Sequence, residues 1–139
     1  MFEYLEKRKV PLIYFPLILY WIILFTATSL PAANLPSVAV GDKLKHFTAF
    51  FGLSVLLSLT LLYQNKVLLL KKYFLAAALI ISSIYGLLDE IHQSFVPGRN
   101  NEFLDWVADS LGAAAGVFIV FYLLKKFKYF PKPLNNFSE

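Results

Sequence analysis

The amino-acid sequence predicts an all-α membrane protein, a bundle of about four transmembrane helices with both termini in the cytoplasm. Of its 139 residues, 58% are hydrophobic and 16% are charged, whereas about a quarter of the residues in an ordinary soluble domain are charged. The apolar residues form four long blocks and do not alternate with polar residues at the period of an amphipathic helix or strand. The basic residues lie beside these blocks, mostly on one side. Composition, blocks and charge asymmetry together predict the fold class.

The length of each apolar block justifies one predicted span, because crossing about 30 Å of hydrocarbon takes about 20 residues. The first block has no charged residue, and the third is the shortest. The predicted spans are residues 10–30, 46–63, 73–88 and 106–124.

The segments between the blocks carry turn signals. Pro31 and Pro36 mark the first loop, residues 64–72 form a short polar turn, and Pro97-Gly98 breaks the chain before the last span. We expect residues 1–139 to form a single membrane domain that ends in a polar tail at 125–139.

The orientation follows from the basic residues near the span ends, because cytoplasmic loops are enriched in Lys and Arg. Ten basic residues fall on one predicted side: Lys7, Arg8, Lys9, Lys66, Lys71, Lys72, Lys125, Lys126, Lys128 and Lys132. Three fall on the other: Lys43, Lys45 and Arg99. The first side is therefore predicted to be cytoplasmic. A cleaved signal peptide over residues 1–33 is the weaker alternative. The hydrophobic region of a signal peptide is usually about 7–15 residues long, and the apolar stretch here is longer.

Three polar clusters fall on the predicted extracytoplasmic side. In the first, Asp42 and His46 are four residues apart and share a helix face. Asp42 could instead cap the second span, with Lys43 and Lys45 reaching to the membrane interface.

The second cluster lies at the outer end of the third span. If the helix continues, Gly86, Glu90 and Gln93 form one stripe that points at a neighbouring helix. Asp89 and His92 form a pair on an adjacent face, where simple solvation would explain them.

The third cluster begins with Arg99 in the Pro97-Gly98 turn. It continues with five residues that share one helix face for four turns: Glu102, Asp105, Asp109, Gly112 and Gly116. Acidic residues favour the first turn of a helix, but an unpaired Asp109 would lie about a turn deeper, where a carboxylate is costly. We expect Arg99 to be its partner. The two glycines favour close packing, within the bundle or against a second copy.

The three clusters belong to the loop between the first and second spans and the loop between the third and fourth spans. Because both loops lie on one membrane face, we expect the three clusters to converge into one pocket. Its predicted members are Asp42, Lys43, His46, Glu90, Gln93, Arg99, Asp105 and Asp109. The alternative is a set of separate caps and surface pairs.

The order and spacing of these residues resemble the VanZ-like family, named after a teicoplanin (glycopeptide) resistance factor. The family pattern is Asp-Lys followed by His-Phe, a Glu and a Gln three apart, a Pro-x-Arg turn, an Asp, and an Asn or similar residue before a glycine-rich helix. The matching residues are Asp42-Lys43, His46-Phe47, Glu90, Gln93, Pro97-Gly98-Arg99, Asp105, and Asp109 before Gly112 and Gly116. The chain departs from the pattern at Asp109, where Asn is expected.

The resemblance implies a multi-pass protein of the bacterial plasma membrane and, for some members, lowered susceptibility to lipoglycopeptide antibiotics. It implies no established reaction. The hypothesis we favour is a protein that binds a lipid-linked cell-wall precursor or a lipoglycopeptide at the extracytoplasmic face and contributes to resistance or envelope maintenance. Arg99 and Lys43 would hold the anion.

Two other classes of function stay open. One is a membrane hydrolase or transferase acting on a lipid or cell-wall precursor, with His46 or Glu90 as general base and with a metal-assisted variant. The other is a small transporter, which four short spans and acids away from the midplane disfavour. The chain has no cysteine and no His-Glu-x-x-His motif. We expect the lipid bilayer as a partner, and neither a resident metal, a cofactor nor nucleic acid.

Overall fold

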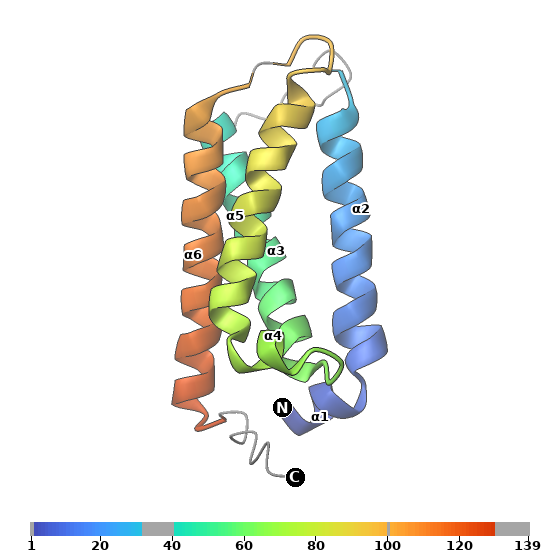
Figure 1. The fold of residues 1–139 in the computed structure, drawn as a ribbon, viewed down its shortest axis with the longest axis vertical. Coiled ribbons are helices and arrows are strands. Elements are labelled where there is room, and N and C mark those ends of the chain that lie inside the picture. Colours follow the sequence, from blue (N-terminus) through green and yellow to red (C-terminus); the bar gives the residue numbers. More distant parts are fainter. Residues whose placement is uncertain (1, 32–40, 100, 130–139) are drawn as a thin grey trace.

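The structure, a computed structural model, describes residues 2–31, 41–99 and 101–129, and every regular element in these ranges is helical (Figure 1). The elements are α1 (Phe2–Lys7), η1 (Val10–Tyr14), α2 (Phe15–Ser29), α3 (Asp42–Tyr63), α4 (Leu68–Lys72), α5 (Phe74–Gln93) and α6 (Phe103–Lys126). The short helices α1 and α4 lie at one end of the bundle, which we call the terminal end. At the opposite end, the site end, α2 and α5 finish while α3 and α6 begin.

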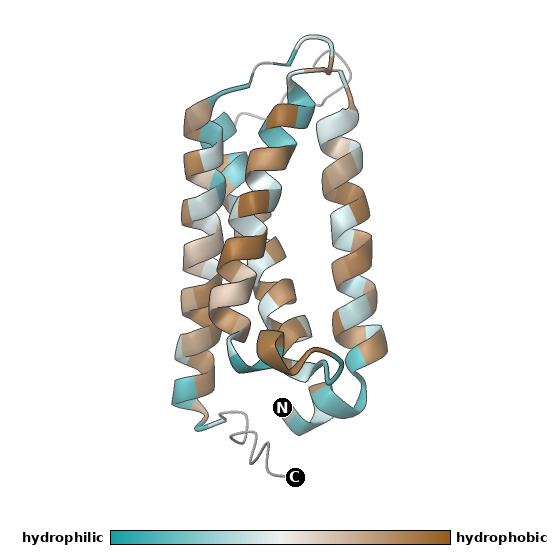
Figure 2. Cartoon of the chain, in the orientation of Figure 1, coloured by the Kyte–Doolittle hydropathy of each residue, from teal (hydrophilic) through white to brown (hydrophobic). Residues whose placement is uncertain are grey.

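Four helices are long and apolar enough to cross a membrane, as predicted: Val10–Ser29, Asp42–Tyr63, Phe74–Gln93 and Phe103–Lys126. Apolar residues colour most of their length, and hydrophilic residues gather toward the two ends (Figure 2). The chain is therefore a multi-pass membrane protein.

The helices extend beyond the predicted apolar blocks. The second span begins at Asp42 rather than at residue 46, the third continues to Gln93 rather than 88, and the fourth begins at Phe103 rather than 106. Backbone hydrogen bonding continues into polar turns, whereas hydropathy marks only the part of a helix that matches the lipid. The predicted polar turn at 64–72 also contains the short helix α4.

The first span opens with a π-helical turn, η1. The Phe15 backbone N–H bonds to the Val10 carbonyl, five residues earlier. Pro16 follows directly and has no N–H to donate. The widened turn accommodates the two prolines, Pro11 and Pro16, without ending the span.

Helices α3 and α6 approach each other closely because α6 presents glycines at the contact. A Cβ added at Gly112 would collide with the Phe47 carbonyl, and one added at Gly116 would collide with Ser54 Oγ and the Phe51 carbonyl. This small-residue face therefore packs inside the bundle. The alternative use of these glycines, against a second copy of the chain, loses its support.

Helix α2 lies at the edge of the bundle and is exposed along much of its length. Its contacts to the other spans include a hydrogen bond from Tyr20 Oη to the Ala49 carbonyl at 2.9 Å. The apolar core includes Ile13, Leu53 and Leu124, each fully buried.

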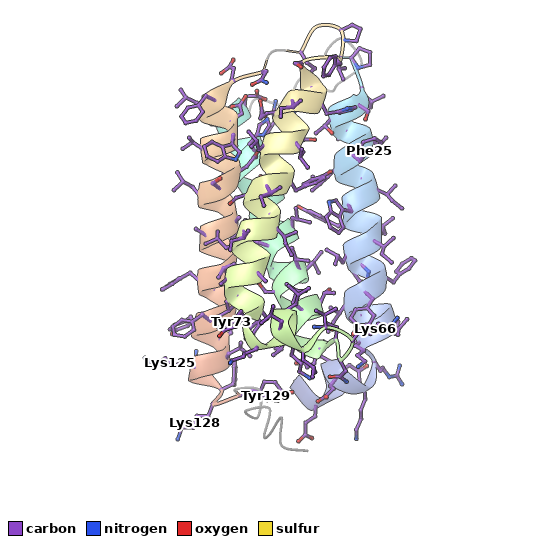
Figure 3. The ribbon with its side chains drawn as sticks, viewed as in Figure 1. Phe25, Lys66, Tyr73, Lys125, Lys128 and Tyr129 are labelled. Carbon is purple, nitrogen blue, oxygen red and sulfur yellow. The ribbon has the colours of Figure 1, made fainter. Side chains whose placement is uncertain are left out.

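Lys66, Lys125 and Lys128 lie at the terminal end (Figure 3). Lys9 belongs to the same end and donates to the Tyr63 carbonyl at 3.0 Å. This placement agrees with the predicted grouping of basic residues. Pro36, Lys132 and the tail after residue 129 lie outside the described residues.

Candidate functional site

The first turn of α3 supplies two charged contacts at the site end. Gly41 precedes the helix, so Asp42 is its first residue and not its cap, contrary to the capping alternative. Asp42 is exposed and lies 3.5 Å from Lys45. Lys43 reaches across to α6, where its Nζ lies 2.5 Å from Glu102 Oε2 and 2.6 Å from Asp105 Oδ1.

His46, one turn further into α3, lies among three carboxylates from α5 and α6. Its Nδ1 is 2.9 Å from Asp109 Oδ1 and 3.8 Å from Glu90 Oε1. Its Nε2 is 4.0 Å from Asp105 Oδ2. The His46 side chain is 10% exposed, and the three carboxylate side chains are at most 5% exposed. We call these four residues the buried cluster.

The stripe predicted on α5 faces the interior, because Gly86, Glu90 and Gln93 are all buried. A Cβ at Gly86 would lie 2.9 Å from Asp109 Oδ2. Gly86 therefore makes room for the carboxylate of Asp109. Glu90 Oε2 accepts a hydrogen bond from the Glu102 backbone N–H at 3.1 Å, which ties α5 to the start of α6.

The face predicted on α6 is also confirmed over most of its length. Asp105, Asp109, Gly112 and Gly116 are buried, whereas the side chain of Glu102 is half exposed. The carboxylates lie nearer the site end, and the glycines lie deeper.

Arg99 does not pair with Asp109, and that prediction was wrong. Its guanidinium donates to the Ala27 carbonyl at 2.8 Å and, at 3.4 Å, to Gln93 Oε1 and the Leu30 carbonyl. The partner of Asp109 is His46, because the close packing of α3 on α6 brings those two side chains together.

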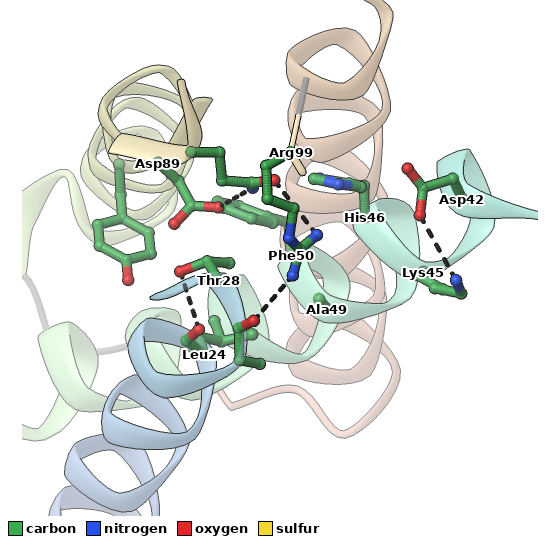
Figure 4. Close-up of a pocket in the computed structure, with 12 residues that line it drawn as sticks. Leu24, Thr28, Asp42, Lys45, His46, Ala49, Phe50, Asp89 and Arg99 are labelled. Carbon is green, nitrogen blue, oxygen red and sulfur yellow. Dashed lines mark hydrogen bonds and ion pairs between the residues drawn. The ribbon is translucent and has the colours of Figure 1, made fainter. Parts of the chain in front are cut away.

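A cavity of about 180 Å³ opens beside the buried cluster at the site end. It is lined by Leu24, Ala27, Thr28, Asp42, Lys45, His46, Ala49, Phe50, Tyr85, Asp89, Gln93 and Arg99. Figure 4 shows Arg99 close to His46 and Phe50, with the end of α2 on the other side. Most of the accessible lining is apolar.

The eight predicted site residues thus belong to two adjoining features rather than one pocket. Asp42, His46, Gln93 and Arg99 line the cavity. Glu90, Asp105 and Asp109 lie behind His46 in the buried cluster, and Lys43 bonds to the edge of that cluster. His46 belongs to both features.

The family model described as VanZ/LLP1 matches residues 9–125. The chain belongs to the VanZ/LLP1 family. This result confirms the resemblance drawn from the polar motifs, and the matched range includes the whole buried cluster and every residue that lines the cavity. Neither the curated proteins nor the solved structures give a match.

Two polar residues that were expected to be solvated have partners in the structure instead. Asp89 is 4% exposed, lines the cavity and accepts a 2.9 Å hydrogen bond from Gln93 Nε2. His92 lies 3.0 Å from Ser29 Oγ and stacks on Phe25 of α2. The i, i+4 spacing of Asp89 and Gln93 was a usable signal, but the position of α2 was needed to place His92.

Three carboxylate oxygens of the buried cluster have no hydrogen-bond partner among the described residues: Glu90 Oε1, Asp105 Oδ1 and Asp109 Oδ2. Asp105 Oδ1 is still ion-paired with Lys43, which leaves Glu90 Oε1 and Asp109 Oδ2. Since unpaired carboxylates are costly at membrane depth, the buried cluster has capacity to bind a proton or a cation.

Proposed function

We propose that this VanZ/LLP1 protein lies in the bacterial plasma membrane and binds an anionic, lipid-linked envelope component or a lipoglycopeptide, contributing to resistance or envelope maintenance. The observation that supports the proposal is the position of Arg99. Its guanidinium lines a cavity whose accessible surface is mostly apolar. A ligand with an anionic head and a hydrocarbon chain matches that combination.

Arg99 can still bind an anion, because two of its three hydrogen bonds are long. Its bonds to Gln93 and Leu30 measure 3.4 Å, beyond the usual range of about 2.7–3.2 Å. A phosphate or carboxylate would form shorter, charge-assisted bonds to the same planar group. Of the two acidic residues that line the cavity, Asp89 accepts a hydrogen bond from Gln93 at 2.9 Å, and Asp42 is exposed and lies 3.5 Å from Lys45.

The distribution of basic residues supports placing the site end outside the cell. Lysines gather at the terminal end, and cytoplasmic segments are enriched in Lys and Arg. The cavity would then open toward the outer leaflet, where lipid-linked cell-wall precursors and lipoglycopeptides are present.

A binding assay with purified protein in lipid nanodiscs tests the proposal. The probes are a short-chain polyprenyl phosphate, the uncharged polyprenol of equal length, and teicoplanin. We expect the phosphate to bind more tightly than the alcohol, and Arg99→Gln to weaken phosphate binding at least tenfold. Arg8→Gln is the matched control, because it removes the only other arginine, at the terminal end.

The proposal fails if the phosphate and the alcohol bind equally well, or if Arg99→Gln and Arg8→Gln behave alike. Arg99→Lys keeps a positive charge but loses the planar fork. A partial loss of binding in Arg99→Lys, with unchanged thermal stability, would attribute the effect to anion recognition.

A membrane hydrolase or transferase is the second candidate, favoured by the contact between His46 and Asp109. A carboxylate that holds one imidazole nitrogen can orient the ring as a general base. Release of inorganic phosphate or a transferred head group would support this candidate. In that case His46→Gln should abolish turnover while leaving polyprenyl phosphate binding nearly unchanged.

A further inference from the structure

In contrast to the expectation from the sequence that no metal is resident, we propose that His46, Glu90 and Asp109 form a binding site for one divalent metal ion, preferentially Zn²⁺. The three residues come from α3, α5 and α6, so the site would connect three of the four spans. The proposal goes beyond ligand binding at Arg99 and does not depend on it.

The donor atoms already have spacings suited to a shared ion. His46 Nδ1 lies 2.9 Å from Asp109 Oδ1 and 3.8 Å from Glu90 Oε1, and all three atoms lie within 4.8 Å of one another. Zinc bonds to nitrogen and oxygen measure about 2.1 Å, which separates tetrahedral ligand atoms by about 3.4 Å. The two observed distances lie on either side of that value, so small side-chain rotations would complete the geometry.

The outward-facing atoms of two ligands have neighbours that would hold them in place. Glu90 Oε2 accepts the Glu102 backbone N–H, which leaves Oε1 directed toward His46. Asp105 Oδ2 lies 4.0 Å from His46 Nε2. A metal-bound histidine usually donates its other ring N–H to a carboxylate or carbonyl. Asp105 is the nearest carboxylate to that nitrogen, and it would have to move closer to accept the hydrogen bond.

The unpartnered oxygen of Glu90 is an independent observation that points to a ligand. The Glu90 side chain is 2% exposed, and its Oε1 has no hydrogen-bond partner among the described residues. Asp109 is fully buried and presents its other oxygen to Gly86 without a partner. Two buried carboxylates carry two negative charges, which one divalent ion neutralises.

The mixed donor set favours Zn²⁺ over Mg²⁺ or Ca²⁺, because an imidazole suits zinc better than it suits those hard cations. Three protein ligands leave a fourth position for water or a ligand oxygen, and His46 also lines the cavity. Asp42, His46 and Asp105 form a second possible group. It is the poorer candidate, because Asp42 is exposed and the Lys43 ammonium already lies 2.6 Å from Asp105.

Metal binding can be measured directly on the full chain. The purified protein is stripped with a chelator, and Zn²⁺ is titrated against a chromophoric competitor. We expect one Zn²⁺ per chain, and at least tenfold weaker binding in His46→Gln and Asp109→Asn. His92→Gln is the matched control, since it removes the other histidine of the sequence at the same end of the bundle.

Wild-type binding no tighter than that of His46→Gln would overturn the proposal, as would a loss confined to His92→Gln. If the His46 and Asp109 variants fail to fold, the visible absorption spectrum of Co²⁺ added to the wild-type protein tests the site. Intense visible absorption from four-coordinate Co²⁺ supports the site, and a weak spectrum like that of aqueous Co²⁺ overturns it. Arg99→Lys should bind Zn²⁺ normally, so a failure of anion binding is distinguishable from a failure of this metal site.

Discussion

The substitution Gly112→Ala tests the packing that brings the buried cluster together. The added methyl group would collide with the Phe47 carbonyl, and a backbone atom cannot rotate aside. Overpacking usually costs about 1–3 kcal/mol, and a backbone collision belongs at the upper end of that range. Alanine recovers about 1 kcal/mol over glycine through its helix propensity. We therefore expect a net loss of about 2 kcal/mol, a factor of about 30 in the folding equilibrium.

The measurement is unfolding of the detergent-solubilised protein in increasing denaturant, followed by the fluorescence of its two tryptophans. Ala114→Leu is the control, because residue 114 is exposed on the same helix and the added bulk would meet only lipid or detergent. We expect the control to lie within about 0.5 kcal/mol of the wild type. Equal or greater stability of Gly112→Ala would refute the close approach of α3 to α6.

Further predictions concern topology and the charged edge of the site. In a chain without native cysteines, Ser94→Cys should react with a membrane-impermeant maleimide added to intact cells, whereas Lys66→Cys should react only after lysis; the reverse result would contradict the proposed orientation. Lys43→Gln should lower the melting temperature more than Lys45→Gln, because it removes the ammonium paired with the buried Asp105. Equal melting temperatures would show that the Lys43 contact contributes nothing measurable.

The number of spans was predictable from the sequence because apolar length alone decides it. The ends of the spans were not, because a helix continues wherever its backbone hydrogen bonds can form. Asp42 and Gln93 are helical although both are polar. Hydropathy therefore located the membrane-embedded part of each helix and missed its polar first or last turn.

Most residues of the candidate site could be predicted because their spacing fixes which face of a helix they share. Their partners could not be predicted, because partners depend on how the helices pack. Arg99 was matched to Asp109 by charge, whereas the approach of α3 to α6 gives Asp109 the imidazole of His46. Asp89 was assigned to a solvated face, and only the position of α2 shows that it lines a cavity.

The absence of a side chain at Gly86 has a consequence for protein engineering. Copying His46, Glu90 and Asp109 onto the helices of another four-span scaffold would not reproduce the cluster. A residue larger than glycine at this position would meet Asp109 and Phe50, so the Asp109 side chain would have to shift from the position in which it contacts the imidazole. The minimal transplantable unit therefore includes Gly86 and Gly112 as well as the polar residues, since the two glycines set the helix spacing in which those residues meet.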